Sequence, residues 1–141
     1  MIGKIAKWSL IGLVVLFAVI QAVPYGRAHK NPAVTQEAPW QNADAKAIAQ
    51  KACYDCHSNR AKWRWYTYVA PFSWLSESDV NSGRKVLNFS QWDKFKGSAG
   101  EAIDQVQSGE MPPWFYWIVH WNARLSGAEK ATLVQGLKQL P

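Results

Sequence analysis

The chain contains few of the residues that mark several common classes of protein. It has only two cysteines in 141 residues, too few for the dense disulfide framework of small secreted domains. It has no polar low-complexity tract, and with 48% hydrophobic residues it is neither disordered nor fibrous. An ordinary hydrophobic core or a cofactor must therefore hold the fold together, and the length is suited to one domain.

The chain also lacks a cluster of basic residues. Its 16 Lys and Arg residues against 10 Asp and Glu give a formal charge of +6, but beyond the first ten positions they are spread from Arg27 to Lys138 with acids between them. Nucleic-acid-binding proteins more often gather Lys and Arg on one element. We therefore expect no nucleic-acid partner, and we interpret the mild positive charge as favouring acidic docking surfaces on other proteins.

Charge is scarce near the N-terminus, where Lys7 is the only charged residue between Ile5 and Val23. A helix over this apolar stretch would be about 28 Å long at about 1.5 Å per residue, close to the hydrocarbon thickness of a bilayer. A cleaved signal peptide is the alternative, but its apolar region is usually only about 7 to 15 residues long and ends in a small-x-small site. The residues after Ile20 lack such a site, so we expect an uncleaved membrane anchor.

These patterns divide the chain into three parts. Residues 1–24 are the expected transmembrane anchor, and residues 25–39 are interpreted as a linker because Gly26, Pro32 and Pro39 interrupt any apolar period. Residues 40–141 are the expected folded domain. We expect the linker to keep this domain near the membrane without fixing it there.

Both cysteines occur in the run Cys53-Tyr54-Asp55-Cys56-His57. This CxxCH spacing lets two thiols form thioethers to the vinyl groups of one haem while the histidine binds the iron. A thioredoxin-like redox dithiol is the main alternative, but the flanks lack alternating strands and helices. A zinc site would need further ligands, and His29 and His120 are the only other histidines. We therefore predict one covalent haem c, which is attached on the outer side of the bacterial cytoplasmic membrane, so the domain is expected to face the periplasm.

A second iron ligand is predicted at Met111, the only methionine beyond the initiator. Pro112 and Pro113 follow it and would hold an extended loop from which the thioether projects. A His/Met pair raises the reduction potential of a haem relative to a His/His pair. His120 is the alternative distal ligand, and a methionine can also simply fill a gap in a core.

Helix signals surround these motifs. Asn42 can cap a helix that runs to Ala52, and Ser98 with Glu101 forms a potential capping box for a helix through Val106 that Gly109 can terminate.

A second potential capping box, Ser126 with Glu129, opens a last helix in which Gly136 would allow close approach to the alanine-rich helix before Cys53. The apolar stripe of that last helix consists of Leu133, Val134, Leu137 and Leu140. A helix over Trp114–Trp121 would be apolar on every face, so core packing is expected for it.

The order of these features resembles a small monohaem c-type cytochrome, and the chain is similar to the haem-binding domain family, a bacterial c-type group. The residues that carry the resemblance are Cys53 to Asn59, Trp63 to Tyr66, Val69 to Pro71, Ser73-Trp74, Gly83-Arg84, Leu87 to Trp92, Met111 to Pro113, His120 and Leu125-Ser126. Arg64 departs from the family pattern, which usually has proline between the two tryptophans. The resemblance implies a mostly α-helical domain around one haem.

By the same resemblance, His57 is the proximal ligand, Cys53 and Cys56 carry the thioethers, and Met111 or His120 is the distal ligand. A ligating histidine normally donates its other N–H to a carbonyl, and we expect that of Pro71 or a near neighbour. Candidates to bind the haem propionates are Arg60, Arg64, Arg84, Trp63, Trp65 and Trp92.

The expected function is single-electron transfer between redox proteins by a membrane-anchored periplasmic cytochrome, without enzymatic activity. A haem-bearing relay subunit of a respiratory or photosynthetic membrane complex is one alternative. A haem sensor or peroxidase-like protein with an open distal side is another.

Overall fold

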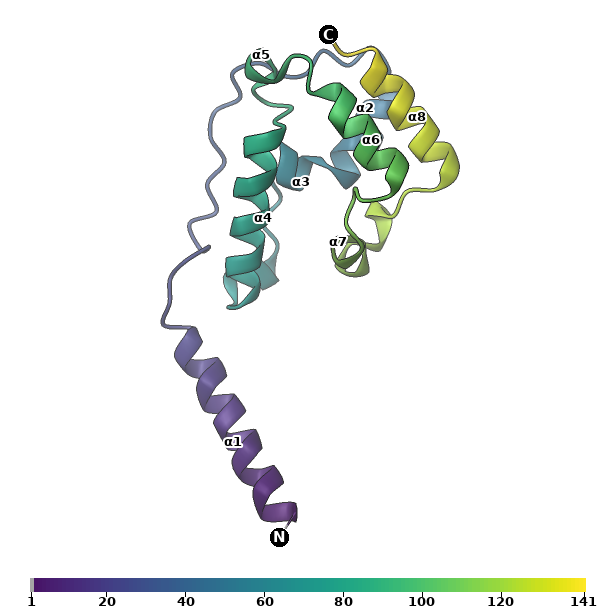
Figure 1. The fold of residues 1–141 in the computed structure, drawn as a ribbon. Helices are drawn as coiled ribbons and strands as arrows, with labels where there is room; N and C mark the ends of the chain where they lie inside the picture. The colour runs from purple at the N-terminus through teal and green to yellow at the C-terminus, as the bar shows by residue number, and fades with distance from the viewer. Residues whose placement is uncertain (1) are drawn as a thin grey trace. The chain divides into compact units, whose positions relative to one another are not determined.

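The computed structural model describes residues 2–141 and is mostly helical, which confirms the predicted fold class (Figure 1). Within these residues there is no strand, and a single parallel bridge joins Gln36 to Gln91. The chain forms two compact units: the first contains the residues up to Lys30 together with Trp63–Asp79, and the second contains Asn31–Lys62 and Val80–Pro141. Helix α4 (Phe72–Val86) contributes residues to both units.

The first unit begins with helix α1 (Ile2–Ile20), which matches the predicted anchor. Its 18-residue stretch Gly3–Ile20 has a mean hydropathy of 1.9 and is long and apolar enough to cross a membrane. The side chains from Lys4 to Val19 are exposed around the whole helix. An apolar helix that is exposed on every face is suited to lipid, since water would not favour it.

Residues 63–79 belong to the first unit because they pack against the chain that leaves α1. The side-chain amide of Gln21 donates to the Ala70 carbonyl (2.9 Å) and its oxygen accepts from the Ala70 amide (3.0 Å). Gly26, with φ of 77°, lies so close to Ser73 that a Cβ would be 2.0 Å from the Ser73 carbonyl oxygen. Only glycine fits that position. This part of the unit contains the 3₁₀ helix η1 (Trp65–Tyr68) and the start of α4.

The residues that we interpreted as a linker are irregular but not free of contacts. In the first unit, the ring of His29 stacks on Trp63 at 4.5 Å, and its Nε2 lies 3.0 Å from the Thr67 carbonyl. In the second unit, Ala38 is buried and its amide donates to the Phe89 carbonyl (2.8 Å). In the structure, residues 31–39 belong to the second unit together with the residues of the predicted domain that follow them.

The core of the second unit lies between α2 (Ala43–Ala52), α6 (Ala99–Ser108) and α8 (Gly127–Lys138), with α8 packed against both of the others (Figure 1). Asn42 caps α2 by accepting from the Asp44 and Ala45 amides, as predicted. The Ser126–Glu129 capping box of α8 is also confirmed. The predicted apolar stripe is buried, with Leu133, Val134 and Leu137 in α8 and Leu140 just beyond its end.

Gly136 is where α8 approaches α2 most tightly. A Cβ at this position would lie 2.2 Å from the Cβ of Ala45, well inside the contact distance of two carbon atoms. The predicted close approach to the alanine-rich helix is confirmed. The helices can meet at this distance only because glycine faces alanine.

Two expectations about helices are wrong. Ser98 does not cap α6 with its side chain, because its backbone is already helical (φ −77°, ψ −4°) and an N-cap residue needs an extended backbone. Most of the segment Trp114–Trp121 is not buried: in α7 (Trp114–Val119) and η2 (Trp121–Ala123), Trp114 is 65% exposed and Trp121 83%. Helix α7 contacts the CxxCH turn through Tyr116, whose hydroxyl donates to Asp55.

Candidate haem site

A cavity of about 270 Å³ in the second unit brings Cys53, His57 and Met111 together. Its size is near the lower end of the range of cofactor sites. The wall is mostly apolar and comes from six parts of the chain: the end of α2, α3 (Tyr54–His57), the end of α4, α6, the loop after α6, and α8. The remaining lining residues are Ala52, Val86, Leu87, Phe89, Ser98, Glu101, Ala102, Gln105, Val106, Pro112, Leu133 and Leu137.

His57 is oriented by two backbone carbonyls. Its Nδ1 lies 3.1 Å from the Gly83 carbonyl oxygen and 3.1 Å from that of Leu87, so Nδ1 carries the proton and donates it. Nε2 is then the nitrogen with a free lone pair, as a metal ligand needs. Burial lowers the pKa of His57, although the two carbonyls oppose this effect, and the lowered pKa favours the neutral ring that can bind a metal.

The carbonyl partner that we expected, Pro71, differs from the partners in the structure. The Pro71 carbonyl accepts from the Trp74 and Leu75 amides (3.0 and 3.1 Å) because α4 begins at the next residue. The Leu87 carbonyl, in contrast, lies just beyond the end of α4, where carbonyls lack partners within the helix. The carbonyls that hold the His57 ring therefore come from the C-terminal end of α4, and not from Pro71 at its N-terminal end.

Gly83 allows α4 to lie directly on the CxxCH turn. A Cβ on Gly83 would be 2.6 Å from the carbonyl oxygen of Cys56 and 3.0 Å from its Cβ. No side chain fits in that space. This contact brings the Gly83 carbonyl within reach of the His57 ring.

Both cysteines are free in the structure, and Cys53 lines the cavity. Burial raises the pKa of the Cys53 thiol to about 12, so this thiol is protonated at neutral pH. The reactive cysteine of a redox dithiol has a lowered pKa instead. Among residues 2–141 no group of three or more His, Cys, Asp or Glu side chains is arranged to hold a metal ion, so nothing there supports a zinc site.

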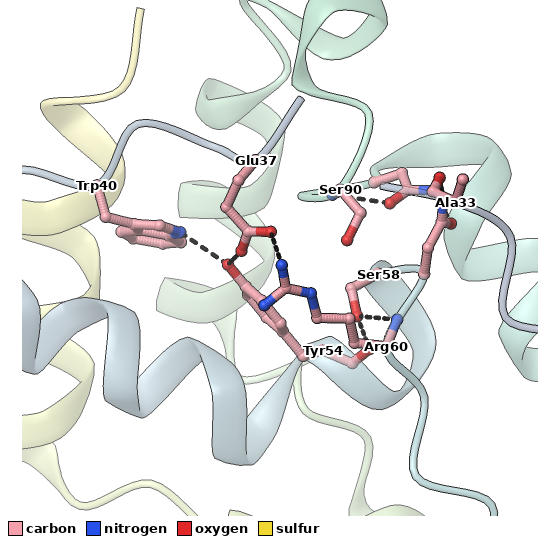
Figure 2. Close-up of polar contacts among 9 residues, drawn as sticks. Ala33, Glu37, Trp40, Tyr54, Ser58, Arg60 and Ser90 are labelled. Carbon is pink, nitrogen blue, oxygen red and sulfur yellow. Dashed lines mark hydrogen bonds and ion pairs between the residues drawn. The ribbon is translucent and has the colours of Figure 1, made fainter. Parts of the chain in front are cut away.

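The two residues between the cysteines anchor the motif to the rest of the second unit. Figure 2 shows the hydroxyl of Tyr54 between Trp40 and Glu37: it donates to Glu37 (2.8 Å) and accepts from the Trp40 indole (2.9 Å). Arg60 forms an ion pair with Glu37 at 3.4 Å (Figure 2). Burial and the neighbouring Glu37 raise the pKa of Tyr54, which keeps the hydroxyl a donor. Asp55 accepts from the Tyr116 hydroxyl of α7 (2.8 Å).

We did not predict these contacts from the sequence, because CxxCH leaves its two middle positions unspecified. The same is true of the chain that follows His57. Ser58 donates to the Tyr54 carbonyl (2.7 Å) and accepts from the Arg60 amide (3.0 Å), as Figure 2 shows. A buried pair, Asn59 and Asn88, continues this network at 2.9 Å. Polar side chains with local partners give no periodic signal in a sequence.

Arg84, a predicted propionate ligand, has protein partners in the structure. Its Nε donates to the Ser58 carbonyl (2.8 Å), and a terminal nitrogen donates to Asn31 (2.9 Å). Arg84 thus stabilises the backbone immediately after His57.

The aromatic candidates Trp63 and Trp65 belong to the first unit and do not appear among the cavity-lining residues, and Trp65 is 79% exposed. Trp92 is fully buried in the core of the second unit. Of the other two arginines that we considered, Arg60 is paired with Glu37 and Arg64 is exposed in the first unit.

The structure separates the two candidates for the distal ligand. Gly109, with φ of 84°, ends α6, and the Met111 amide donates to the Gln105 carbonyl (3.0 Å), which turns the loop back toward the cavity. Met111 lines the cavity with His57, whereas His120 is not among the lining residues. The Nδ1 of His120 lies 3.1 Å from the Tyr116 carbonyl, so His120 has a partner within its own segment.

The residues around the cavity fit a c-type haem by their chemistry. A neutral imidazole with Nε2 available, a thiol of the CxxC pair and a thioether all lie at one apolar cavity. The haem-binding domain family model matches residues 15–139, which is most of the chain. Comparisons with curated proteins and with solved structures gave no match. The chain therefore belongs to the haem-binding domain family, and this membership supports haem binding.

Proposed function

We propose that the chain is a membrane-anchored monohaem c-type cytochrome that carries single electrons between redox proteins on the periplasmic side of a bacterial membrane. The observation that carries this proposal is the meeting of Cys53, His57 and Met111 at one apolar cavity. A bound haem would supply a one-electron redox couple there. Electron transfer needs no step on a substrate, so the proposal includes no enzymatic activity.

The residues of the chain have separate roles in this proposal. Cys53 and Cys56 would hold the cofactor through thioethers, and His57 would bind it through Nε2, because the Gly83 and Leu87 carbonyls hold Nδ1. Met111 would supply a soft thioether that favours ferrous iron and so raises the reduction potential. A haem held by both residues would leave no site for a small ligand, which favours a carrier over a sensor or a peroxidase-like protein.

Helix α1 supports the membrane location, since it is long and apolar enough to span a bilayer. Haem c is attached outside the cytoplasm, so the haem domain faces the periplasm in this proposal. The formal charge of +6 favours acidic partners and an encounter rate that falls as salt rises.

One observation favours a second function, a relay subunit of a larger membrane complex. Four large apolar side chains of α7 and η2 are more than half exposed: Trp114, Ile118, Val119 and Trp121. Such a face is typical of a surface that another chain covers. Purification in mild detergent distinguishes the two functions, because a relay subunit stays with its complex and a carrier elutes alone.

The visible spectrum of the ferric protein tests the ligand pair. Met111→Ala should abolish the weak long-wavelength band that sulfur ligation gives and should lower the reduction potential. His120→Ala is the matched control and should leave both unchanged. Loss of ligation in the His120 variant with retention in the Met111 variant would reverse the assignment, and ready binding of carbon monoxide by the reduced wild-type protein would contradict the carrier function.

A further inference from the structure

Helix η1 and the start of α4 expose an unusual set of side chains in the first unit. We define the interfacial segment as residues 65–75. Four of its large apolar side chains are more than half exposed: Trp65 at 79%, Tyr68 at 53%, Phe72 at 51% and Leu75 at 57%. Its buried side chains are small instead: Thr67, Ala70 and Ser73. A segment that faces water would have the opposite arrangement.

The exposed side chains are grouped on the outside of their helices. Trp65 and Tyr68 are three residues apart in the 3₁₀ helix η1, where such positions lie above one another. Phe72 and Leu75 are three residues apart in α4, and such positions are neighbours on one helix face. The interfacial segment is therefore amphipathic with its apolar side outward.

This outward apolar side lies next to the end of the membrane-spanning candidate. Gln21 directly follows α1, and its side-chain amide both donates to and accepts from the backbone of Ala70, in the middle of the segment. Gly26 lies against the Ser73 carbonyl. Because these contacts lie within one compact unit, the segment is held at the point where α1 leaves the hydrocarbon core.

The residue types match the boundary between lipid and water. Trp and Tyr are enriched at this boundary, where the ring is in contact with lipid and the polar group with water. Tyr25, which is 51% exposed, lies in the segment that follows α1, between Gln21 and Gly26. The sequence from Arg64 to Ser76 contains no Asp or Glu, and Arg64 is exposed, so the segment carries no charge that anionic headgroups would repel.

We propose that the interfacial segment lies in the headgroup region of the membrane and inserts Trp65, Tyr68, Phe72 and Leu75 between the lipids, as a second membrane contact beside α1. This inference depends on one part of the proposed function, namely that α1 spans the membrane. The occupant of this surface is a lipid bilayer, because the surface is continuous with the end of the membrane span and another protein is not needed to cover it.

Labelling from lipid tests this contact on the full-length haem-loaded protein. The protein is reconstituted into vesicles of phosphatidylcholine and phosphatidylglycerol that contain a phospholipid with a photoactivatable diazirine near the headgroup. After illumination and trypsin digestion, mass spectrometry should find label on the peptide 65–84, within residues 65–75, and on α1. The peptide 131–138 of α8, whose exposed residues Ala131, Gln135 and Lys138 belong to the second unit, is the control and should carry several-fold less label.

A pair of variants separates insertion from mere proximity. Phe72→Glu with Leu75→Glu should lower the label on residues 65–75 several-fold while the label on α1 is unchanged. Ile118→Glu, on the exposed face of α7, should leave both signals unchanged. Label on α1 with only the α8 level on residues 65–75 would overturn this proposal and leave the membrane anchor intact. Absence of label from α1 would overturn the anchor and this proposal together.

Discussion

At the scale of single residues, the orientation of His57 depends on two backbone carbonyls and a glycine. The carbonyls of Gly83 and Leu87 fix the ring through Nδ1, and the missing side chain of Gly83 lets α4 approach Cys56 closely enough to do so. The proximal side of the candidate haem site is thus determined by main-chain geometry. A mutation that changes that geometry should affect both stability and ligation.

Gly83→Ala should lower the free energy of unfolding by about 1–3 kcal/mol, because the new Cβ would overlap the Cys56 carbonyl and the helix must move away. Urea denaturation measures this change. Gly100→Ala in α6 is the matched control, since nothing lies within 4 Å of its position and alanine favours a helix by up to about 1 kcal/mol. Equal destabilisation by both substitutions would contradict the close contact at Gly83.

The sequence is most informative about residues whose identity the chemistry requires. The meeting of Cys53, His57 and Met111 at one cavity could be predicted, because the thioethers and iron ligands that we propose need those side chains. The partners of His57 could not, because any residue has a carbonyl and the choice between Pro71 and Leu87 depends on where α4 begins and ends. Tyr54 and Glu37 were missed for a similar reason, since their contact depends on how residues 31–39 pack.

At the scale of elements, the pairing of α2 with α8 forms one wall of the core beside the cavity. Gly136 and Ala45 allow the helices to meet, and a hydrogen bond and ion pair join Lys51 of α2 to Glu129 of α8. Glu129 also belongs to the capping box that begins α8. Packing and charge therefore act on the same pair of helices and can be tested separately.

Gly136→Ala should destabilise the domain by about 1–3 kcal/mol through overlap with Ala45. If the overlap is the cause, adding Ala45→Gly should recover part of the loss, even though Ala45→Gly alone costs about 1 kcal/mol of helix propensity. A double-mutant cycle measured by urea denaturation gives the coupling. Strictly additive effects would show that the two positions do not touch.

The ion pair predicts a pH dependence. The hydrogen bond from Lys51, followed by the contacts with Ser126, lowers the pKa of Glu129 from 4.5 to about 2. Above pH 4.5 the carboxylate is ionised in both states and its stabilising effect is complete. As pH falls from 4.5 toward 2 the unfolded state takes up the proton first, so the free energy of unfolding decreases.

Lys51→Met should flatten this acid-side decrease, because it removes the main cause of the lowered pKa. Lys138→Met, at the exposed end of α8, should not. Urea denaturation at a series of pH values from neutral to acidic compares the two variants. A decrease in stability that is equally steep in both would show that Lys51 does not hold the Glu129 carboxylate.

Element boundaries could be predicted where a local signal decides them. The caps at Asn42 and Ser126 are of this kind, because each side chain needs only amides within three residues. The cap at Ser98 failed because the preceding helix, α5 (Trp92–Phe95), and its turn already impose a helical backbone there. Burial of α7 could not be predicted, since an apolar pattern does not show whether protein, lipid or water covers it.

At the scale of the whole molecule, the family match and the cavity support haem binding, and helix α1 is long and apolar enough to cross a membrane. The three-part division that we predicted from the sequence treats residues 25–39 as a connector. The structure instead joins residues 63–79 to the exit of α1 through Gln21 and Gly26. Such contacts are distant in sequence, so no local pattern marks them.

The mass of the intact protein tests the central claim most directly. The chain is produced with the machinery that attaches haem c, unfolded in acid and organic solvent, and measured by mass spectrometry. The account predicts that the unfolded chain retains the mass of one haem, and that Cys53→Ser with Cys56→Ser releases the haem on unfolding. A wild-type chain that unfolds without haem mass would contradict covalent attachment at Cys53 and Cys56.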